Sequence, residues 1–119
     1  MKHLGILIIF SLQLVASNLA MADNKRINNI QVIALYQIED ESDAGFDFFS
    51  SKKLHKCGGK ESNRFRSYSD NENINERKFS LIKSALNYHH RVTVVTMGCE
   101  GRTMLVGTIG AARNPIKKP

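Results

Sequence analysis

Residues 73–110 of the chain read NINERKFSLIKSALNYHHRVTVVTMGCEGRTMLVGTIG, and this stretch decides the fold. In its first half apolar side chains recur at steps of three and four, which predicts an amphipathic helix over residues 73–90. Asn73 is the expected N-cap, with Glu76 completing a capping box. The stripe that this helix is expected to turn toward the core contains Phe79, Ile82, Ala85, Leu86 and His89.

After the helix the hydrophobic period changes from about 3.6 residues to two. Residues 92–97 (VTVVTM) are rich in β-branched side chains, and residues 104–109 (MLVGTI) alternate in the same way. Gly98 and Gly101 lie between the two runs, a pattern typical of a β-hairpin. Both faces of the pair carry apolar groups, which suits a closed or nearly closed sheet better than a one-sided sheet.

The earlier part of the mature chain supplies three further expected strands. The first covers residues 27–38, the second starts in the aromatic run at Phe46 and ends near Cys57, and the third, weaker one covers residues 63–69. We therefore expect a mainly β domain: an OB-fold-like barrel of five short strands with one helix between the third and fourth. The alternative is a small α+β sheet with the helix across one face. Residues 111–119 are small, basic and proline-containing, which predicts a frayed tail.

The N-terminus has the features of an export signal. Lys2 and His3 form a short basic region, residues 4–15 are largely apolar, and Ala20-Met21-Ala22 is a small-x-small cleavage site. We expect residues 1–22 to be removed, which leaves residues 23–119 as one small exported domain, periplasmic or secreted. The alternative is an uncleaved anchor, but the apolar run is short for a membrane span and is interrupted by polar side chains.

The mature chain contains two cysteines, Cys57 and Cys99. An even number of cysteines in a small exported domain favours a disulfide between them. Free thiols or an intermolecular bridge are the alternatives. The bond would tie the end of the early sheet to the strand that follows the helix.

The formal net charge of +6 falls to +5 when the signal, with Lys2, is removed. Acidic residues 39–41 lie between basic stretches, so the charge predicts a solvated surface rather than a polyanion-binding face. We expect no nucleic-acid partner, and no stable membrane insertion after signal cleavage.

The sequence contains no recognisable catalytic or metal-binding constellation. His89 and His90 are adjacent, so their side chains point apart, and His55 lies in a basic stretch away from any spaced set of ligands. The carboxylates concentrate in a turn-like, wet segment where shifted pKa values are not expected: Glu39, Asp40, Glu41, Asp43 and Asp47. We expect no enzyme activity, no cofactor and no metal.

Four strand residues could form a ligand-stacking surface of the kind that small β-barrels use for oligonucleotides or oligosaccharides. They are Phe46, Phe48, Arg66 and Tyr68. The competing interpretation, and the more frequent one for aromatic residues of this kind, is that they belong to the core.

The layout resembles small exported OB-fold proteins typified by the B subunits of the subtilase-cytotoxin and typhoid-toxin type. The similar features are the export signal, early strands ending in a cysteine, the helix over residues 78–89, and the order Cys57-Gly58-Gly59, helix, Gly98-Cys99-Glu100-Gly101. This chain differs in having no Trp and only two cysteines, and no sugar-contacting residue can be transferred to it. The resemblance implies a secreted, non-enzymatic binding module with a glycan or protein partner, assembled as a homo-oligomer. The alternative is a stand-alone periplasmic accessory or structural protein.

Overall fold

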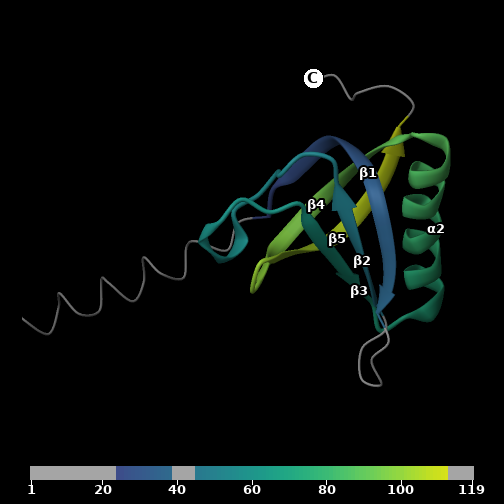
Figure 1. Cartoon of the computed structure of the whole chain (residues 1–119). Helices are drawn as coiled ribbons and strands as arrows, with labels where there is room; N and C mark the ends of the chain where they lie inside the picture. Colours follow the sequence, from purple (N-terminus) through teal and green to yellow (C-terminus); the bar gives the residue numbers. More distant parts are fainter. Residues whose placement is uncertain (1–23, 39–44, 113–119) are drawn as a thin grey trace, which may run out of the picture.

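The computed structural model describes residues 24–38 and 45–112, which form five strands and one α-helix (Figure 1). The strands are β1 (Arg26–Ile38), β2 (Gly45–Ser50), β3 (Arg64–Tyr68), β4 (Arg91–Glu100) and β5 (Thr103–Ala112). The helix α2 (Glu72–Tyr88) lies between β3 and β4, and a short 3-10 turn η1 (Cys57–Gly59) lies between β2 and β3. The predicted export signal, the acidic residues 39–43 and residues 113–119 lie outside the described parts.

The five strands close into a barrel in the order β1-β2-β3-β5-β4, with β4 returning to β1. All neighbours are antiparallel except β3 and β5, which are parallel. The mainly β, five-stranded barrel with a helix between the third and fourth strands is therefore confirmed. The structure differs from the alternative, a small α+β sheet with the helix across one face, because β1 pairs with β4 and closes the sheet into a ring.

Strand β1 makes the closure because it pairs with two partners along its 13 residues. Its first part pairs with β4 and its second part with β2. The register shifts between Ile27 and Ile30, where Asn29 has a left-handed φ of 59°. Asparagine tolerates this conformation better than most residues, and such irregularities bend a strand. The bend carries β1 from one side of the barrel to the other.

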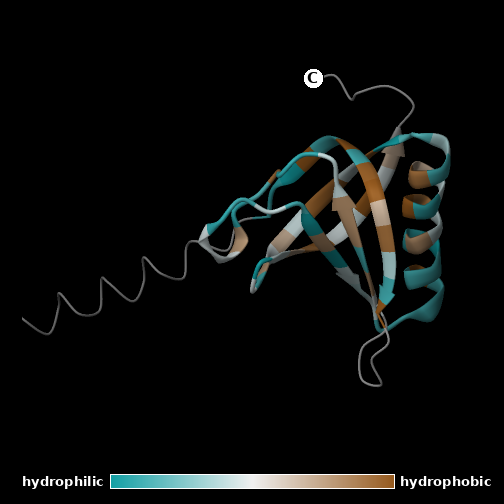
Figure 2. Ribbon diagram, viewed as in Figure 1, coloured by the Kyte–Doolittle hydropathy of each residue, from teal (hydrophilic) through white to brown (hydrophobic). Residues whose placement is uncertain are grey.

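The barrel interior is filled by apolar side chains from every strand, together with two from α2. Figure 2 shows hydrophobic residues along the strands and on part of α2. Strand residues alternate between inside and outside, so every second position contributes. The buried set is Ile30, Val32, Phe46, Phe48, Phe65, Val92, Val94, Val106 and Ile109 from the strands, with Ile82 and Ala85 from the helix.

The N-cap of helix α2 lies two residues earlier than predicted. Asn71 is the N-cap, and its side-chain oxygen accepts hydrogen bonds from the backbone N–H groups of Asn73 and Ile74. The predicted capping box of Asn73 and Glu76 is wrong, because Asn73 already lies in the first turn. The sequence offers an asparagine at both positions, but only Asn71 has the extended backbone that a cap requires.

The buried stripe of α2 is correct in its centre and wrong at its end. Ile82 and Ala85 are buried, and Phe79 and Leu86 pack against the core from partly exposed positions. His89 is exposed, because it ends the helix with a left-handed φ of 59° and points away from the barrel. Among the described residues, no helix is long and apolar enough to cross a bilayer.

Two strand boundaries differ from the prediction. Strand β2 ends at Ser50 rather than near Cys57, because the backbone of Ser51 turns to donate to the Gln31 carbonyl. Strand β5 extends to Ala112, so the first two residues of the predicted tail are paired with β4 instead of frayed. Small side chains do not prevent pairing when the neighbouring strand supplies the hydrogen-bond partners.

Candidate functional site

The outer face of β1, β2 and β3 carries the largest group of interacting polar side chains in the described part of the chain. Asp47 on β2 lies opposite Tyr36 on β1 and Arg66 on β3. Phe49 lies two residues further along β2, opposite Arg64. Successive strand residues point to opposite sides, so Asp47 and Phe49 face outward while Phe46 and Phe48 face the core.

This alternation divides the predicted ligand surface in two. Phe46 and Phe48 are 0% exposed and pack inside the barrel, as the competing core interpretation held, so they are unavailable to a ligand. Arg66 and Tyr68 lie on the outside, and the structure places Asp47, Arg64 and Glu100 beside them. The prediction that all four residues share one surface is therefore wrong, because Phe46 and Phe48 belong to the core. Of the four, only Arg66 and Tyr68 lie on the outer face.

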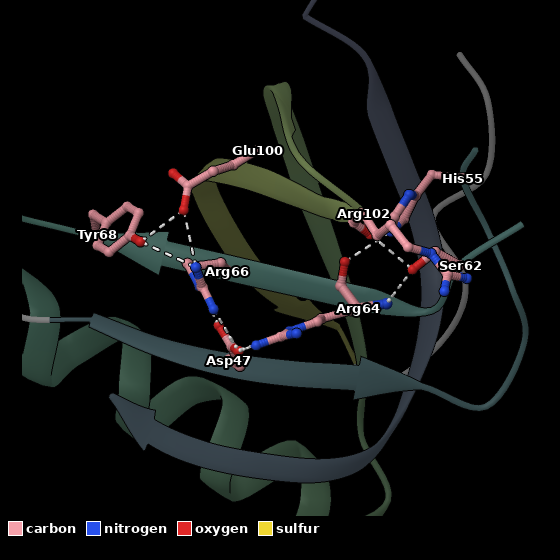
Figure 3. Close-up of polar contacts among 8 residues, drawn as sticks. All are labelled: Asp47, His55, Ser62, Arg64, Arg66, Tyr68, Glu100 and Arg102. Carbon is pink, nitrogen blue, oxygen red and sulfur yellow. Dashed lines mark hydrogen bonds and ion pairs between the residues drawn. The ribbon is translucent and has the colours of Figure 1, made fainter. Parts of the chain in front are cut away.

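The side chains of Arg64 and Arg66 both donate hydrogen bonds to the Asp47 carboxylate, as Figure 3 shows. Arg64 donates from Nε and Nη2 to Oδ2 of Asp47 at 2.9 and 2.6 Å. Arg66 donates from Nε to Oδ1 at 2.6 Å and from Nη2 to Oδ2 at 3.0 Å. Four charge-assisted hydrogen bonds thus converge on one carboxylate, which is only 5% exposed.

Arg66 also links this carboxylate to the end of β4. Its Nη1 donates to Glu100 Oε1 at 2.9 Å and to the Tyr68 hydroxyl at 3.2 Å, and that hydroxyl donates to the same Glu100 oxygen at 3.0 Å. We call Asp47, Arg64, Arg66, Tyr68 and Glu100 the arginine–carboxylate network. It contains two formal positive and two formal negative charges, so it is neutral as a whole.

The network shifts the pKa values of Asp47, Arg66 and Tyr68. Burial alone would raise the pKa of Asp47, but the hydrogen bonds and charges of Arg66 and Arg64 outweigh burial and hold the pKa below its usual 3.8. The hydrogen bond to Asp47 raises the pKa of Arg66. Burial, together with Glu100, raises the pKa of Tyr68 above 10.0 against the opposing effect of Arg66. At neutral pH Asp47 and Arg66 are therefore charged, and Tyr68 is a neutral donor.

Beside the network, several groups on the same face remain in contact with solvent. The Arg64 side chain is 43% exposed and the Glu100 side chain 47% exposed, so both can hydrogen-bond outward. The Tyr36 ring is 61% exposed and meets Phe49 edge to face at 5.8 Å. The outer face of β1–β3 thus combines an accessible aromatic ring with charged donors and acceptors.

The buried His55 imidazole joins the start of β3 to η1 through two hydrogen bonds to the backbone. Its Nε2 donates to the Arg64 carbonyl at 2.7 Å, and its Nδ1 accepts from the backbone N–H of Cys57 at 3.2 Å. Burial lowers the pKa of His55 below 6.5 despite the hydrogen bond to the carbonyl, so the imidazole is neutral at pH 7. In the described residues no group of three or more His, Cys, Asp or Glu side chains is arranged to hold a metal ion.

The predicted disulfide between Cys57 and Cys99 is confirmed. It ties η1 to β4 next to the arginine–carboxylate network, and it packs beside Met104, whose sulfur lies 4.0 Å from that of Cys57. The disulfide therefore holds the connection between β2 and β3 against the end of the β4–β5 hairpin.

Sequence reasoning missed Tyr36, Arg64 and Glu100, and assigned Asp47 to a wet acidic turn. A signal for part of the network was present. In residues 46–49 (FDFF), Asp47 alternates with phenylalanines, and in residues 64–68 (RFRSY) two arginines flank Phe65 in the same way. Two adjacent strands with one buried face bring such outward charges together. Glu100 carried no comparable signal, because its proximity depends on how the barrel closes.

We expect Asp47→Asn to lower the free energy of unfolding by about 2 kcal/mol at pH 7, because two guanidinium groups lose their charged partner. Removing one partner of a fully buried pair costs roughly 3–5 kcal/mol. The cost is smaller here because Arg64 is partly exposed and can be hydrated. The measurement is urea unfolding at a series of pH values, with the exposed Glu61→Gln as the matched control.

The pH dependence has a definite sign. The pKa of Asp47 is lower in the folded than in the unfolded protein, so the stabilisation is complete above the unfolded value, near 3.8, and is lost as pH falls through the folded value. The stability difference between wild type and Asp47→Asn should therefore be constant near neutral pH and shrink below about pH 4. A difference that is absent at pH 7, or that grows in acid, would contradict this role of Asp47.

No family model matches the chain, and neither the curated proteins nor the solved structures compared with it include a match.

Proposed function

We propose that the protein is an exported, non-enzymatic binding module that recognises a glycan on the outer face of β1–β3. The observation that carries the proposal is the exposed Tyr36 ring, set against Phe49 and beside the arginine–carboxylate network. An aromatic ring next to a few well-positioned polar groups is the usual composition of a site for a small polar ligand.

The closed order of the five strands and the helix between β3 and β4 are compatible with the expected OB-like barrel, and this supports the choice of face. OB folds bind oligosaccharides and oligonucleotides mainly on the face formed around the second and third strands. Arg64 and Arg66 lie on β3 and Asp47 lies on β2, so the network occupies this position. The network is neutral overall, which favours an uncharged sugar over a polyanion.

The properties of the network also support binding over catalysis. General acid–base chemistry needs a group that gains or loses a proton near neutral pH. Arg66 and Arg64 hold Asp47 ionised through four hydrogen bonds, so this carboxylate is poorly suited to accept a proton. Its rigid neighbours instead present fixed donors and acceptors, which reduces the entropy lost on binding.

The test is an array of glycans probed with wild type, Tyr36→Ala and the control Tyr88→Ala, whose ring is also exposed but lies on α2. We expect one glycan class to bind, and Tyr36→Ala to weaken that binding at least about tenfold, as loss of a hot-spot side chain does. Tyr88→Ala should bind like wild type. If no glycan binds above background, or both variants lose binding equally, the proposal fails and the accessory-protein alternative becomes the better description.

Ring formation by several copies is a further expectation from the resemblance to toxin B subunits. We propose it as a secondary property of the module, because multivalent display raises the avidity of weak sugar sites. Light scattering on the oxidised protein would distinguish a closed oligomer from a monomer.

A further inference from the structure

The connection between β2 and β3 gathers positive charge at one end of the barrel. We call residues 51–63 the basic loop. Its lysines, all exposed, are Lys52, Lys53, Lys56 and Lys60. Arg102, from the β4–β5 turn, lies against it, since a Cβ added to Gly58 would be only 2.9 Å from Cγ of Arg102. The basic loop and Arg102 together carry five cations and one carboxylate, Glu61, and so have a net charge of +4, within a chain whose net charge is +6.

The basic loop is an ordered platform. Its two sides are joined by a β-bridge between His55 and Ser62, with backbone hydrogen bonds of 2.8 and 3.3 Å. The Ser62 hydroxyl donates to the Arg102 carbonyl at 2.9 Å, and the disulfide from Cys57 to Cys99 fastens η1 to β4. The backbone positions that carry the lysines are therefore held in one arrangement.

The lysines of the basic loop form no ion pairs within the described residues. The three ion pairs found there all belong to the arginine–carboxylate network, and none involves a lysine. The acidic side chains near α2 lie at the other end of β2 and β3, where Asp70, Glu72 and Glu76 follow Tyr68. The lysines of the basic loop and these three acidic side chains therefore lie at opposite ends of β2 and β3. From the sequence, the excess of positive charge was expected to be dispersed. In the fold, Arg102 lies against the basic loop and adds a fifth cation to its four lysines.

We propose that the basic loop docks the protein on a phosphate-bearing lipid surface without inserting into it. Clusters of four or more lysines and arginines bind anionic lipid headgroups through summed electrostatic attraction. Lysine is a compact point charge that suits such a surface, whereas planar recognition of single groups favours arginine. The apolar side chain of Leu54 is partly buried. The loop contains no Phe, Tyr or Trp, and its one aromatic ring, that of His55, is buried, so no ring is exposed for nucleic-acid bases to stack on. The proposal rests on charge and loop order, so it stands or falls separately from the glycan site.

The test is cosedimentation of the oxidised protein with vesicles of phosphatidylcholine, alone or with one-third phosphatidylglycerol. We expect binding only to the anionic vesicles. It should weaken strongly when ionic strength rises from about 0.1 M to about 1 M, because the screening length falls from about 10 Å to about 3 Å. Each lysine near an anionic surface contributes about fivefold in affinity. The double variant Lys53→Gln with Lys56→Gln should therefore bind about 25-fold more weakly.

The matched control is Arg77→Gln with Lys83→Gln, which removes the same charge from exposed positions on α2 and should change binding less than about twofold. Equal loss in both double variants would overturn the proposal, because net charge and not the loop would then drive binding. Displacement from the vesicles by inorganic phosphate at constant ionic strength would identify a site for the free ion and also overturn the proposal. Binding to heparin without binding to anionic vesicles would overturn it in favour of a soluble polyanion.

Discussion

The Ile82→Asp variant should fail to fold. Ile82 is 0% exposed at the centre of α2, among the side chains that fill the barrel. Truncating a buried isoleucine costs about 2–5 kcal/mol, and a buried unpaired carboxylate adds several more. A domain of this size has a total stability of only about 5–15 kcal/mol, so the two losses together approach or exceed it. Circular dichroism should show no cooperative thermal transition and no near-ultraviolet signal.

The neighbouring position supplies the control. Lys83 is the next residue along the helix and is exposed, so Lys83→Asp should cost no more than about 1 kcal/mol, mainly through helix propensity. Leu86→Asp should be intermediate, because Leu86 is only partly buried against the core. A cooperatively folded Ile82→Asp protein with native spectra would show that the helix is placed incorrectly on the barrel.

The second large effect is expected from loss of the disulfide. Cys57 and Cys99 are 42 residues apart, and closing a loop of that length stabilises a protein by about 4 kcal/mol in the chain-entropy model. Cys99→Ser removes the bond with little change in packing, since Cys99 is exposed whereas Cys57 is 1% exposed. We expect Cys99→Ser to lower the free energy of unfolding by about 3–4 kcal/mol in urea titrations.

Treatment with a reductant distinguishes the stability lost with the disulfide from the stability lost through other effects of the Cys99→Ser substitution. Wild type treated with dithiothreitol should lose about as much stability as the variant has lost, and the variant should not respond to the reagent. The local hydrogen bonds of the basic loop remain in both cases, so the barrel itself should still fold. If oxidised wild type and Cys99→Ser unfold at the same urea concentration, the bond is absent or contributes nothing.

The sequence was sufficient for the elements whose signals are local. Helix α2 and the β4–β5 hairpin follow from periodicity, and apolar groups on both faces of that hairpin correctly indicated closure. The cap was misplaced because Asn71 and Asn73 are chemically identical, and only the backbone conformation at Asn71 selects between them. His89 fits the buried stripe by spacing, but the helix ends there in a left-handed turn.

The candidate site was less accessible to sequence reasoning. The surface interpretation placed Phe46 and Phe48 on the outer face of β2, whereas they point into the core. Such an error is easy to make, because a shift of one residue in a strand moves every side chain to the other face. The register that pairs Asp47 with Arg66, and the closure that brings Glu100 to Arg66, are long-range properties of the barrel. The position of Arg102 against the basic loop is likewise a tertiary contact. Residue types were visible in the sequence, but their neighbours were not.

We propose above that a glycan binds on the outer face of β1–β3. The most direct measurement is a map of backbone amide chemical shifts as oxidised protein is titrated with the glycan that gives the strongest array signal. We predict saturable shifts concentrated at Tyr36, Phe49, Arg64, Tyr68 and Glu100, with α2 unchanged. Shifts concentrated on α2 or the β4–β5 outer face, or none for any glycan tested, would contradict the claim.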